Sequence, residues 1–137
     1  MKTVLVFGDR KWDDYDFLRD RLNQIHSKVG IAKIVSGHAN GADKMGERFA
    51  AEIGVECLVF PAQWERYGRA AGPIRNQQML DEGGVEYGVG FHDKIEESRG
   101  TKDMMSRLLK AELPVEIVSH KEGSKVYLPE HFWDVLA

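Results

Sequence analysis

Residues 31–43 show most directly how strand and helix follow each other in this chain, and they read Ile31-Ala32-Lys33-Ile34-Val35-Ser36-Gly37-His38-Ala39-Asn40-Gly41-Ala42-Asp43. Its first five residues form an apolar, β-branched run that is typical of a buried strand. Two glycines then predict a tight turn. Beyond the turn, apolar residues return at helical spacing, at Ala42, Met45, Phe49 and Ile53, before Gly54. The stretch therefore predicts a strand that ends in glycine and leads directly into a helix.

The same alternation of strand and helix extends over most of the chain. Further helices are expected to begin near Tyr15, Pro73 and Thr101, and either Asp13 or Asp14 can cap the first of them. Apolar runs predict the other strands, at residues 4–7, 55–60, 85–91 and 115–118. Strands that alternate with helices pair in parallel through right-handed crossovers. We therefore expect an α/β fold, a single Rossmann-like open parallel sheet with helices on both faces.

Length and composition indicate one domain that spans residues 1–137, with a core at about 1–119 and a C-terminal tail at 120–137. The tail carries the apolar run 126–128 and then Phe132 and Trp133, which can cover a sheet edge or a partner subunit. The net charge of -3 argues against a dedicated duplex-DNA binder, because such domains are usually strongly basic.

The setting indicated by the sequence is cytoplasmic. Cys57 is the single cysteine, so an intramolecular disulfide cannot form, and its apolar neighbours predict a small buried side chain. The apolar run at residues 4–7 is too short for a signal-peptide core, and no run approaches the roughly 20 residues of a membrane helix.

Three glycine-containing segments follow predicted strands and are the candidate ligand-binding loops. In such an α/β sheet ligands bind at the carboxyl ends of the strands, where free N–H groups and helix dipoles favour a phosphate. In the first segment, Gly8 permits close approach of a ligand and Arg10 offers a planar fork to an anion, although an ordinary turn is the alternative. The segments are Gly8-Asp9-Arg10, Gly37-His38-Ala39-Asn40-Gly41-Ala42-Asp43 and Ser98-Arg99-Gly100-Thr101.

In the second segment, Gly37 and Gly41 predict a nest of N–H groups around an anion, followed by the small Ala42. The alternative is that Asp43 only complements the helix dipole and that His38 is a surface residue. The histidines and acidic residues lack the spacing of metal ligands, and we expect neither a metal nor a cofactor.

The long connection at residues 61–73 contains Trp64, Tyr67, Arg66 and Arg69. We expect Trp64 to pack in the core, and stacking on a planar ligand such as a base is the alternative. Beyond it, Gly72, Arg75 and Asn76 lie near a helix start, where an arginine favours an anion or is simply solvated.

The third segment combines hydroxyl donors on Ser98 and Thr101 with close backbone approach at Gly100. Asp103 follows in the first helical turn. On local grounds it complements the helix dipole, and a catalytic role is the alternative, because a carboxylate beside a phosphate site is electrostatically unfavourable.

Together these motifs resemble the SLOG superfamily, a Rossmann-like group that includes the Lonely-guy phosphoribohydrolases and the DNA-processing protein DprA. The chain is most similar to the small YspA-type SLOG domains, which are frequent in bacteria and phages. The residues that carry the resemblance are Gly8-Asp9-Arg10 with Trp12, Ser36-Gly37 with Gly41-Ala42-Asp43, Phe60-Pro61-Ala62 with Trp64, Ala71-Gly72-Pro73 with Arg75-Asn76 and Met79, and Ser98 with Gly100-Thr101 and Asp103-Met104.

The resemblance implies a nucleotide or nucleotide-derived ligand at the strand ends. In Lonely-guy enzymes an arginine and a glutamate hydrolyse the bond between base and ribose 5-phosphate, and Arg75 and Asp103 are similar to these two positions. The chain differs where Glu97-Ser98-Arg99 replaces a glycine pair, and where Asp103 is one methylene shorter than glutamate. These differences favour binding over hydrolysis. SLOG enzymes are typically dimers, so the resemblance also implies a homodimer.

Three hypotheses of function follow. The leading one is a domain that senses or sequesters a nucleotide-type small molecule. The second is an N-glycosidase of nucleoside monophosphates that uses Arg75 and Asp103. The third is single-stranded nucleic-acid binding through Trp64, Tyr67 and the nearby arginines, which the acidic net charge disfavours.

Overall fold

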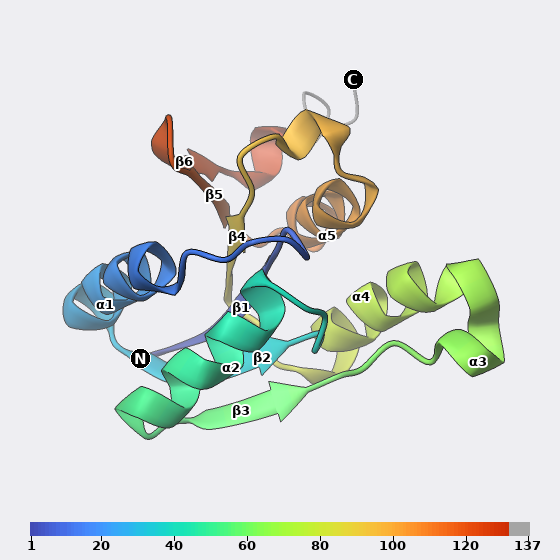
Figure 1. The fold of residues 1–137 in the computed structure, drawn as a ribbon, viewed down its shortest axis with the longest axis horizontal. Helices are drawn as coiled ribbons and strands as arrows, with labels where there is room; N and C mark the ends of the chain where they lie inside the picture. Colours follow the sequence, from blue (N-terminus) through green and yellow to red (C-terminus); the bar gives the residue numbers. More distant parts are fainter. Residues whose placement is uncertain (132–137) are drawn as a thin grey trace.

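The computed structural model describes residues 1–131 and is built on a six-stranded sheet with strand order β3-β2-β1-β4-β5-β6 (Figure 1). The first five strands pair in parallel, and β6 pairs antiparallel with β5. The expected α/β, Rossmann-like fold is confirmed. The strands are β1 (Lys2–Gly8), β2 (Ile31–Ser36), β3 (Glu56–Val59), β4 (Tyr87–Phe91), β5 (Val115–Ser119) and β6 (Gly123–Tyr127).

Helices cover both faces of the sheet, as the alternation of elements predicted. Alternate residues of β1 enter two separate cores: Val4 and Val6 pack under α1 and α2, while Leu5 and Phe7 pack under α4 and α5. This alternation follows from the two-residue period of a strand and explains why the run at 4–7 is apolar throughout. The helices are α1 (Tyr15–Val29), α2 (Ala42–Ile53), α3 (Trp64–Tyr67), α4 (Ala71–Glu82) and α5 (Arg99–Lys110).

The sheet has a sixth strand that the sequence analysis did not predict, and this strand pairs antiparallel. Only residues 120–122 separate β5 from β6, and a parallel crossover needs a dozen or more residues, so the chain can only turn back as a hairpin. The run at 126–128 thus contributes to a sheet edge, one of the two alternatives left open for the tail. Phe132 and Trp133 lie outside the described residues.

Several boundaries are now defined. Asp14, rather than Asp13, is the N-cap of α1, and its carboxylate accepts a hydrogen bond from the Phe17 N–H at 3.1 Å. The connection at 61–73 includes the one-turn helix α3 and a 3-10 turn (Gly68–Ala70). Further 3-10 turns occur at Ile95–Glu97 and Pro129–His131. Cys57 is only partly buried. Within residues 1–131, no helix combines the length and apolar character needed to cross a membrane.

Candidate functional site

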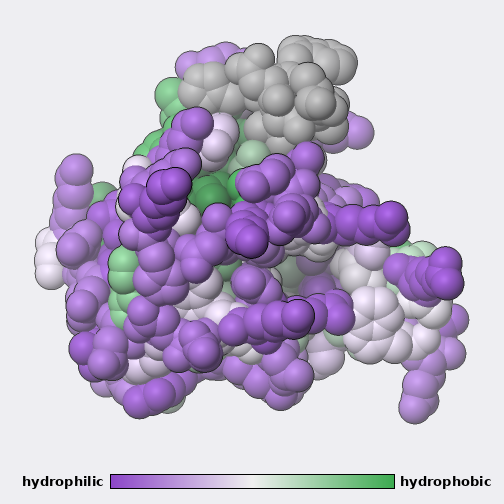
Figure 2. All heavy atoms as spheres, turned by 45° about the horizontal axis from the view of Figure 1, so that its top comes forward, coloured by the Kyte–Doolittle hydropathy of each residue, from purple (hydrophilic) through white to green (hydrophobic). Residues whose placement is uncertain are grey.

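A cavity of about 680 Å³ lies where β1 and β4 end and where α4 and α5 begin. The face drawn in Figure 2 is largely hydrophilic and is hollowed near its middle. Most of the candidate residues from all three predicted loops and from α4 line the cavity together. They are Gly8, Asp9, Arg10, Asp43, Trp64, Gly72, Arg75, Asn76, Ser98, Gly100, Thr101 and Asp103.

The first loop is fixed by a close approach of two strands. Gly8 has a φ of 149°, and a Cβ at this position would lie 2.2 Å from the carbonyl oxygen of Phe91. The next residue, Asp9, donates its N–H to that same carbonyl at 2.9 Å. Glycine is therefore required where β1 ends beside β4, and the requirement places Asp9 and Arg10 at the cavity wall.

The second loop supports the site mainly through internal contacts. The N–H of His38 binds the Ser36 hydroxyl at 3.1 Å, and the N–H of Ala42 binds the Asp9 carbonyl at 3.1 Å. The N–H of Ala39 binds the Asp43 carboxylate at 3.3 Å. These three N–H groups are paired within the protein, whereas the predicted nest rests on Gly37 and Gly41 and stays a prediction.

The loop residues Gly37, His38, Gly41 and Ala42 are not part of the cavity lining, unlike Asp43. The imidazole of His38 is instead paired with the carboxylate of Glu47 at 2.9 Å. Gly41 faces the backbone of the first loop, where a Cβ would lie 2.2 Å from the Asp9 carbonyl oxygen. Within the turn Ala39 lines the cavity, while Gly41 and Ala42 hold the first loop in place.

Arg75 and Asp43 bring opposite charges into the buried wall of the cavity. The guanidinium of Arg75 donates to the carbonyl of Gly37 and, at 3.0 Å, to the side chain of Asn76. A Cβ on Gly37 would lie 2.5 Å from a guanidinium nitrogen of Arg75 and 2.9 Å from a carboxylate oxygen of Asp43. The two charged groups therefore approach each other across a position where only glycine fits.

Burial shifts the pKa of both groups toward the neutral form. Asp43 is 5% exposed, and desolvation raises the pKa of its carboxyl to about 6 although nearby Arg75 opposes the shift. Burial also lowers the pKa of Arg75. A buried arginine and an acid with a raised pKa in one cavity are typical of functional sites.

Asp103 is held in a fixed position at the same cavity. Its carboxylate accepts hydrogen bonds from the amide of Asn76 at 2.9 Å and from the guanidinium of Arg107 at 2.8 Å. Arg107 is anchored in turn by Gln77 of α4 at 3.0 Å. The sequence analysis did not include Arg107, although its place four residues after Asp103 on one helix indicates such a pair.

The N-terminus of α5 forms one edge of the cavity. Ser98 is the N-cap, and its hydroxyl oxygen accepts a hydrogen bond from the Thr101 N–H at 3.0 Å. Gly100 has open space where a Cβ would stand, so the backbone is accessible there. The Ser98 O–H and the accessible backbone remain as donors toward a ligand.

Trp64 is not a core residue, and the expectation that it packs in the core was wrong. Its side chain is 48% exposed and lines the cavity, with the guanidinium carbon of Arg10 at 5.4 Å from the ring centroid. Both core clusters are completed by the helices on the sheet, whereas Trp64 opens a one-turn helix beyond the end of β3. The alternative of a ligand-facing ring is the one that agrees with this position.

Further residues line the cavity that the sequence analysis did not single out as site residues, and several are basic. Lys11, Arg69 and Arg99 join Arg10 and Arg75 around the cavity, against the acidic residues Asp9, Asp43 and Asp103. Lys11 directly follows the first glycine loop and Arg99 lies within the third, a signal that could have been used. The remaining lining residues are Phe7, Ala39, Pro73, Met79, His92 and Met104.

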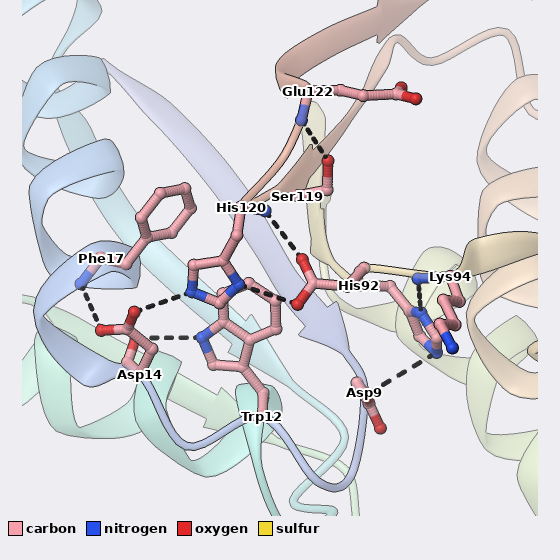
Figure 3. A network of polar contacts seen from close by, with 10 residues as sticks. Asp9, Trp12, Asp14, Phe17, His92, Lys94, Ser119, His120 and Glu122 are labelled. Atoms are coloured by element: carbon pink, nitrogen blue, oxygen red, sulfur yellow. Dashed lines mark hydrogen bonds and ion pairs between the residues drawn. The ribbon is translucent and has the colours of Figure 1, made fainter.

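His92 lines the cavity and precedes Asp93, which belongs to a second polar cluster centred on His120 (Figure 3). The Nδ1 of His92 accepts the Lys94 N–H at 2.9 Å, and its Nε2 lies 4.0 Å from the Asp9 carboxylate.

Within residues 1–131, no group of three or more His, Cys, Asp or Glu side chains could hold a metal ion.

The imidazole of His120 lies between two carboxylates, with Asp14 at 2.7 Å and Asp93 at 2.8 Å, and stacks on Trp12 at 4.5 Å (Figure 3). Hydrogen bonds to both carboxylates raise the pKa of His120, and the same contacts lower the pKa of Asp14 and Asp93. This cluster ties the start of α1 to the chain that follows β4 and β5.

Residues 2–67 match the model of the YspA, cpYpsA-related SLOG family. The chain is also 35% identical over 124 residues to the Gene 61 protein of Mycobacterium phage D29, an alignment that covers 84% of this chain and 94% of that protein. The chain belongs to the YspA-related SLOG family. This confirms the resemblance drawn from the motifs. The family match ends before Arg75 and Asp103. No solved structure gives a significant match.

Proposed function

We propose that this SLOG chain binds a nucleotide or nucleotide-derived anion in the cavity at the strand ends, as a sensing or sequestering domain. The observation that carries the proposal is the charge of the cavity. Five arginine and lysine side chains and three aspartates line it, although the chain as a whole has a net charge of -3. Membership in the SLOG family supports a ligand of this class.

The buried Arg75 is the strongest anion-binding group in the proposed site. It is 8% exposed, and its planar fork suits a phosphate, while a low local dielectric strengthens its attraction to one. The N-terminus of α5 adds N–H groups and a positive dipole end at the cavity edge. Together these groups favour a phosphate over a neutral ligand.

The test is calorimetric titration of the four ribonucleoside monophosphates into wild type, Arg75→Gln, Arg99→Ala and Lys110→Ala. Lys110→Ala is the matched control, because Lys110 is exposed at the far end of the helix that begins with Arg99. Loss of a charge-assisted contact is expected to weaken binding about tenfold or more in the first two variants. Wild type that binds none of the nucleotides refutes the proposal.

A second candidate is hydrolysis of the N-glycosidic bond, and the fixed carboxylate of Asp103 favours it. Two side chains orient this carboxylate at the cavity, where it could stabilise an oxocarbenium-like ribose. Free base released from a nucleoside monophosphate, measured by chromatography, tests the candidate. Asp103→Asn should abolish release while binding is largely kept, and turnover equal to wild type would rule out a role for Asp103.

A further inference from the structure

Trp64 is far more exposed to solvent than Trp12, the other tryptophan among the described residues. Its side chain is 48% exposed, whereas Trp12 is 5% exposed. Trp64 opens α3, which lies beyond the end of β3 and away from both cores (Figure 1). A large aromatic ring that faces water at the edge of a cavity is a favourable surface for a planar, apolar partner.

The Arg10 guanidinium lies over the Trp64 ring, and this contact is weak. The guanidinium carbon of Arg10 lies 5.4 Å from the Trp64 centroid, and Arg10 itself is exposed. Within residues 1–131 the Arg10 side chain makes no hydrogen bond or ion pair to another residue. A cation over an exposed ring is a weak contact, and a base that stacks on the full ring forms a stronger one.

The strand order separates the two ends of the cavity. Trp64 follows the edge strand β3, whereas Ser98 and Gly100 follow β4, and β2 and β1 lie between these two strands. Arg10 follows β1 and therefore stands between the aromatic end and the α5 end. It can contact the Trp64 ring or an anion in the middle of the cavity.

We propose that Trp64 is the base-stacking platform of the cavity, and that Arg10 transfers from the Trp64 ring to the ligand's phosphate when the base stacks. The inference rests on the proposed nucleotide binding and narrows its ligand class. The ligand must carry a planar base as well as an anion, and a sugar phosphate without a base would bind only through the anion.

The experiment compares each ribonucleoside monophosphate with ribose 5-phosphate by calorimetry, in wild type, Trp64→Ala, Trp64→Phe, Arg10→Met and Tyr67→Ala. Tyr67 is the matched control, because it belongs to the same helix, is 38% exposed and does not line the cavity. Trp64→Ala should weaken nucleotide binding about tenfold and leave ribose 5-phosphate unchanged. Trp64→Phe should restore most of the affinity, Arg10→Met should weaken both ligands, and Tyr67→Ala neither.

Fluorescence gives an independent readout. The emission of wild type minus that of Trp64→Phe reports Trp64, and it should be quenched by the nucleotides but not by ribose 5-phosphate. The platform is overturned if Trp64→Ala binds nucleotides as tightly as wild type does, or loses both ligands equally. Wild type that binds no nucleotide would instead refute the proposed function itself, together with this inference.

Discussion

Glu116 and Asp43 are both buried carboxylates, but the protein satisfies them differently. Glu116 is fully buried on β5, and its oxygens accept hydrogen bonds from Arg21 at 2.8 Å and from the Tyr87 hydroxyl at 2.8 Å. These donors lower the pKa of Glu116 in spite of burial. Asp43 accepts a backbone N–H at 3.3 Å, and its pKa is raised.

The difference separates a structural charge from a charge at a candidate site. Glu116 joins β5 to α1 through Arg21 and does not line the cavity. Asp43 lines the cavity and faces Arg75 without forming an ion pair within the described part of the chain. A buried acid without a direct cation destabilises the fold, and groups of this kind concentrate where a ligand is bound.

The largest expected effect comes from breaking the satisfied pair. Arg21→Met leaves the Glu116 carboxylate buried without its cation and should lower the free energy of unfolding by about 3–5 kcal/mol. Urea denaturation at pH 7 measures the loss. Arg19→Met is the control on the same helix, because the ion pairs of Arg19 within residues 1–131 are with exposed aspartates. Its effect should stay within about 0.5 kcal/mol.

The double variant Arg21→Met/Glu116→Leu tests the reason for that loss. If an unpaired buried charge is the cause, removing the carboxylate as well should recover a large part of the stability. A double variant that is less stable than Arg21→Met would mean that packing around α1, and not charge, controls this region.

Asp43→Asn should raise the free energy of unfolding, by a smaller amount than Arg21→Met lowers it. Since the pKa of Asp43 is raised to about 6 in the folded chain, the folded state binds more protons than the unfolded state between about pH 4 and 6. The contribution of Asp43 to stability therefore falls as pH rises through this window. Asparagine mimics the protonated acid, so the variant should be about 2–3 kcal/mol more stable than wild type at pH 7.

Urea denaturation at pH 4, 5, 6 and 7 follows this gain, which should shrink toward pH 4 as wild type becomes protonated. Asp13→Asn is the control, because Asp13 is exposed, and its effect should not change over this range. A gain for Asp43→Asn that stayed constant from pH 4 to pH 7 would argue against the raised pKa.

Local patterns predicted much of the fold and part of the site. The run at 31–35, its glycines and the stripe that follows predicted β2 and α2, because strand and helix periods are visible within a few residues. Parallel strands bring their carboxyl ends to one edge, and so the glycine loops could be placed at a common site. Gly8, Arg75 and Asp103 meet there for that reason.

The errors arose where the outcome depends on contacts distant in sequence. The N–H of Ala42 is taken by Asp9, which no local motif around Gly41 indicates. Trp64 is exposed because the two cores are filled by other helices, a property of the whole fold and not of residues 61–73. The strand β6 was not predicted, and its antiparallel pairing follows from the short connection after β5.

The third titratable site is His120, which lies between two carboxylates in a partly exposed cluster. Replacing His120 should have the smallest effect on the free energy of unfolding. Its pKa is raised above 6.5, so its contribution to stability is complete below pH 6.5 and is lost as pH rises through the folded pKa. Because the imidazole is 40% exposed, solvent screening limits that contribution to less than about 1 kcal/mol. Wild type should therefore exceed His120→Gln in unfolding free energy more at pH 6 than at pH 9, as measured by urea denaturation. The titration of Asp43 is common to both proteins and cancels in this difference. A gap of equal size at pH 6 and pH 9 would show that stacking on Trp12, and not charge, holds His120 in place.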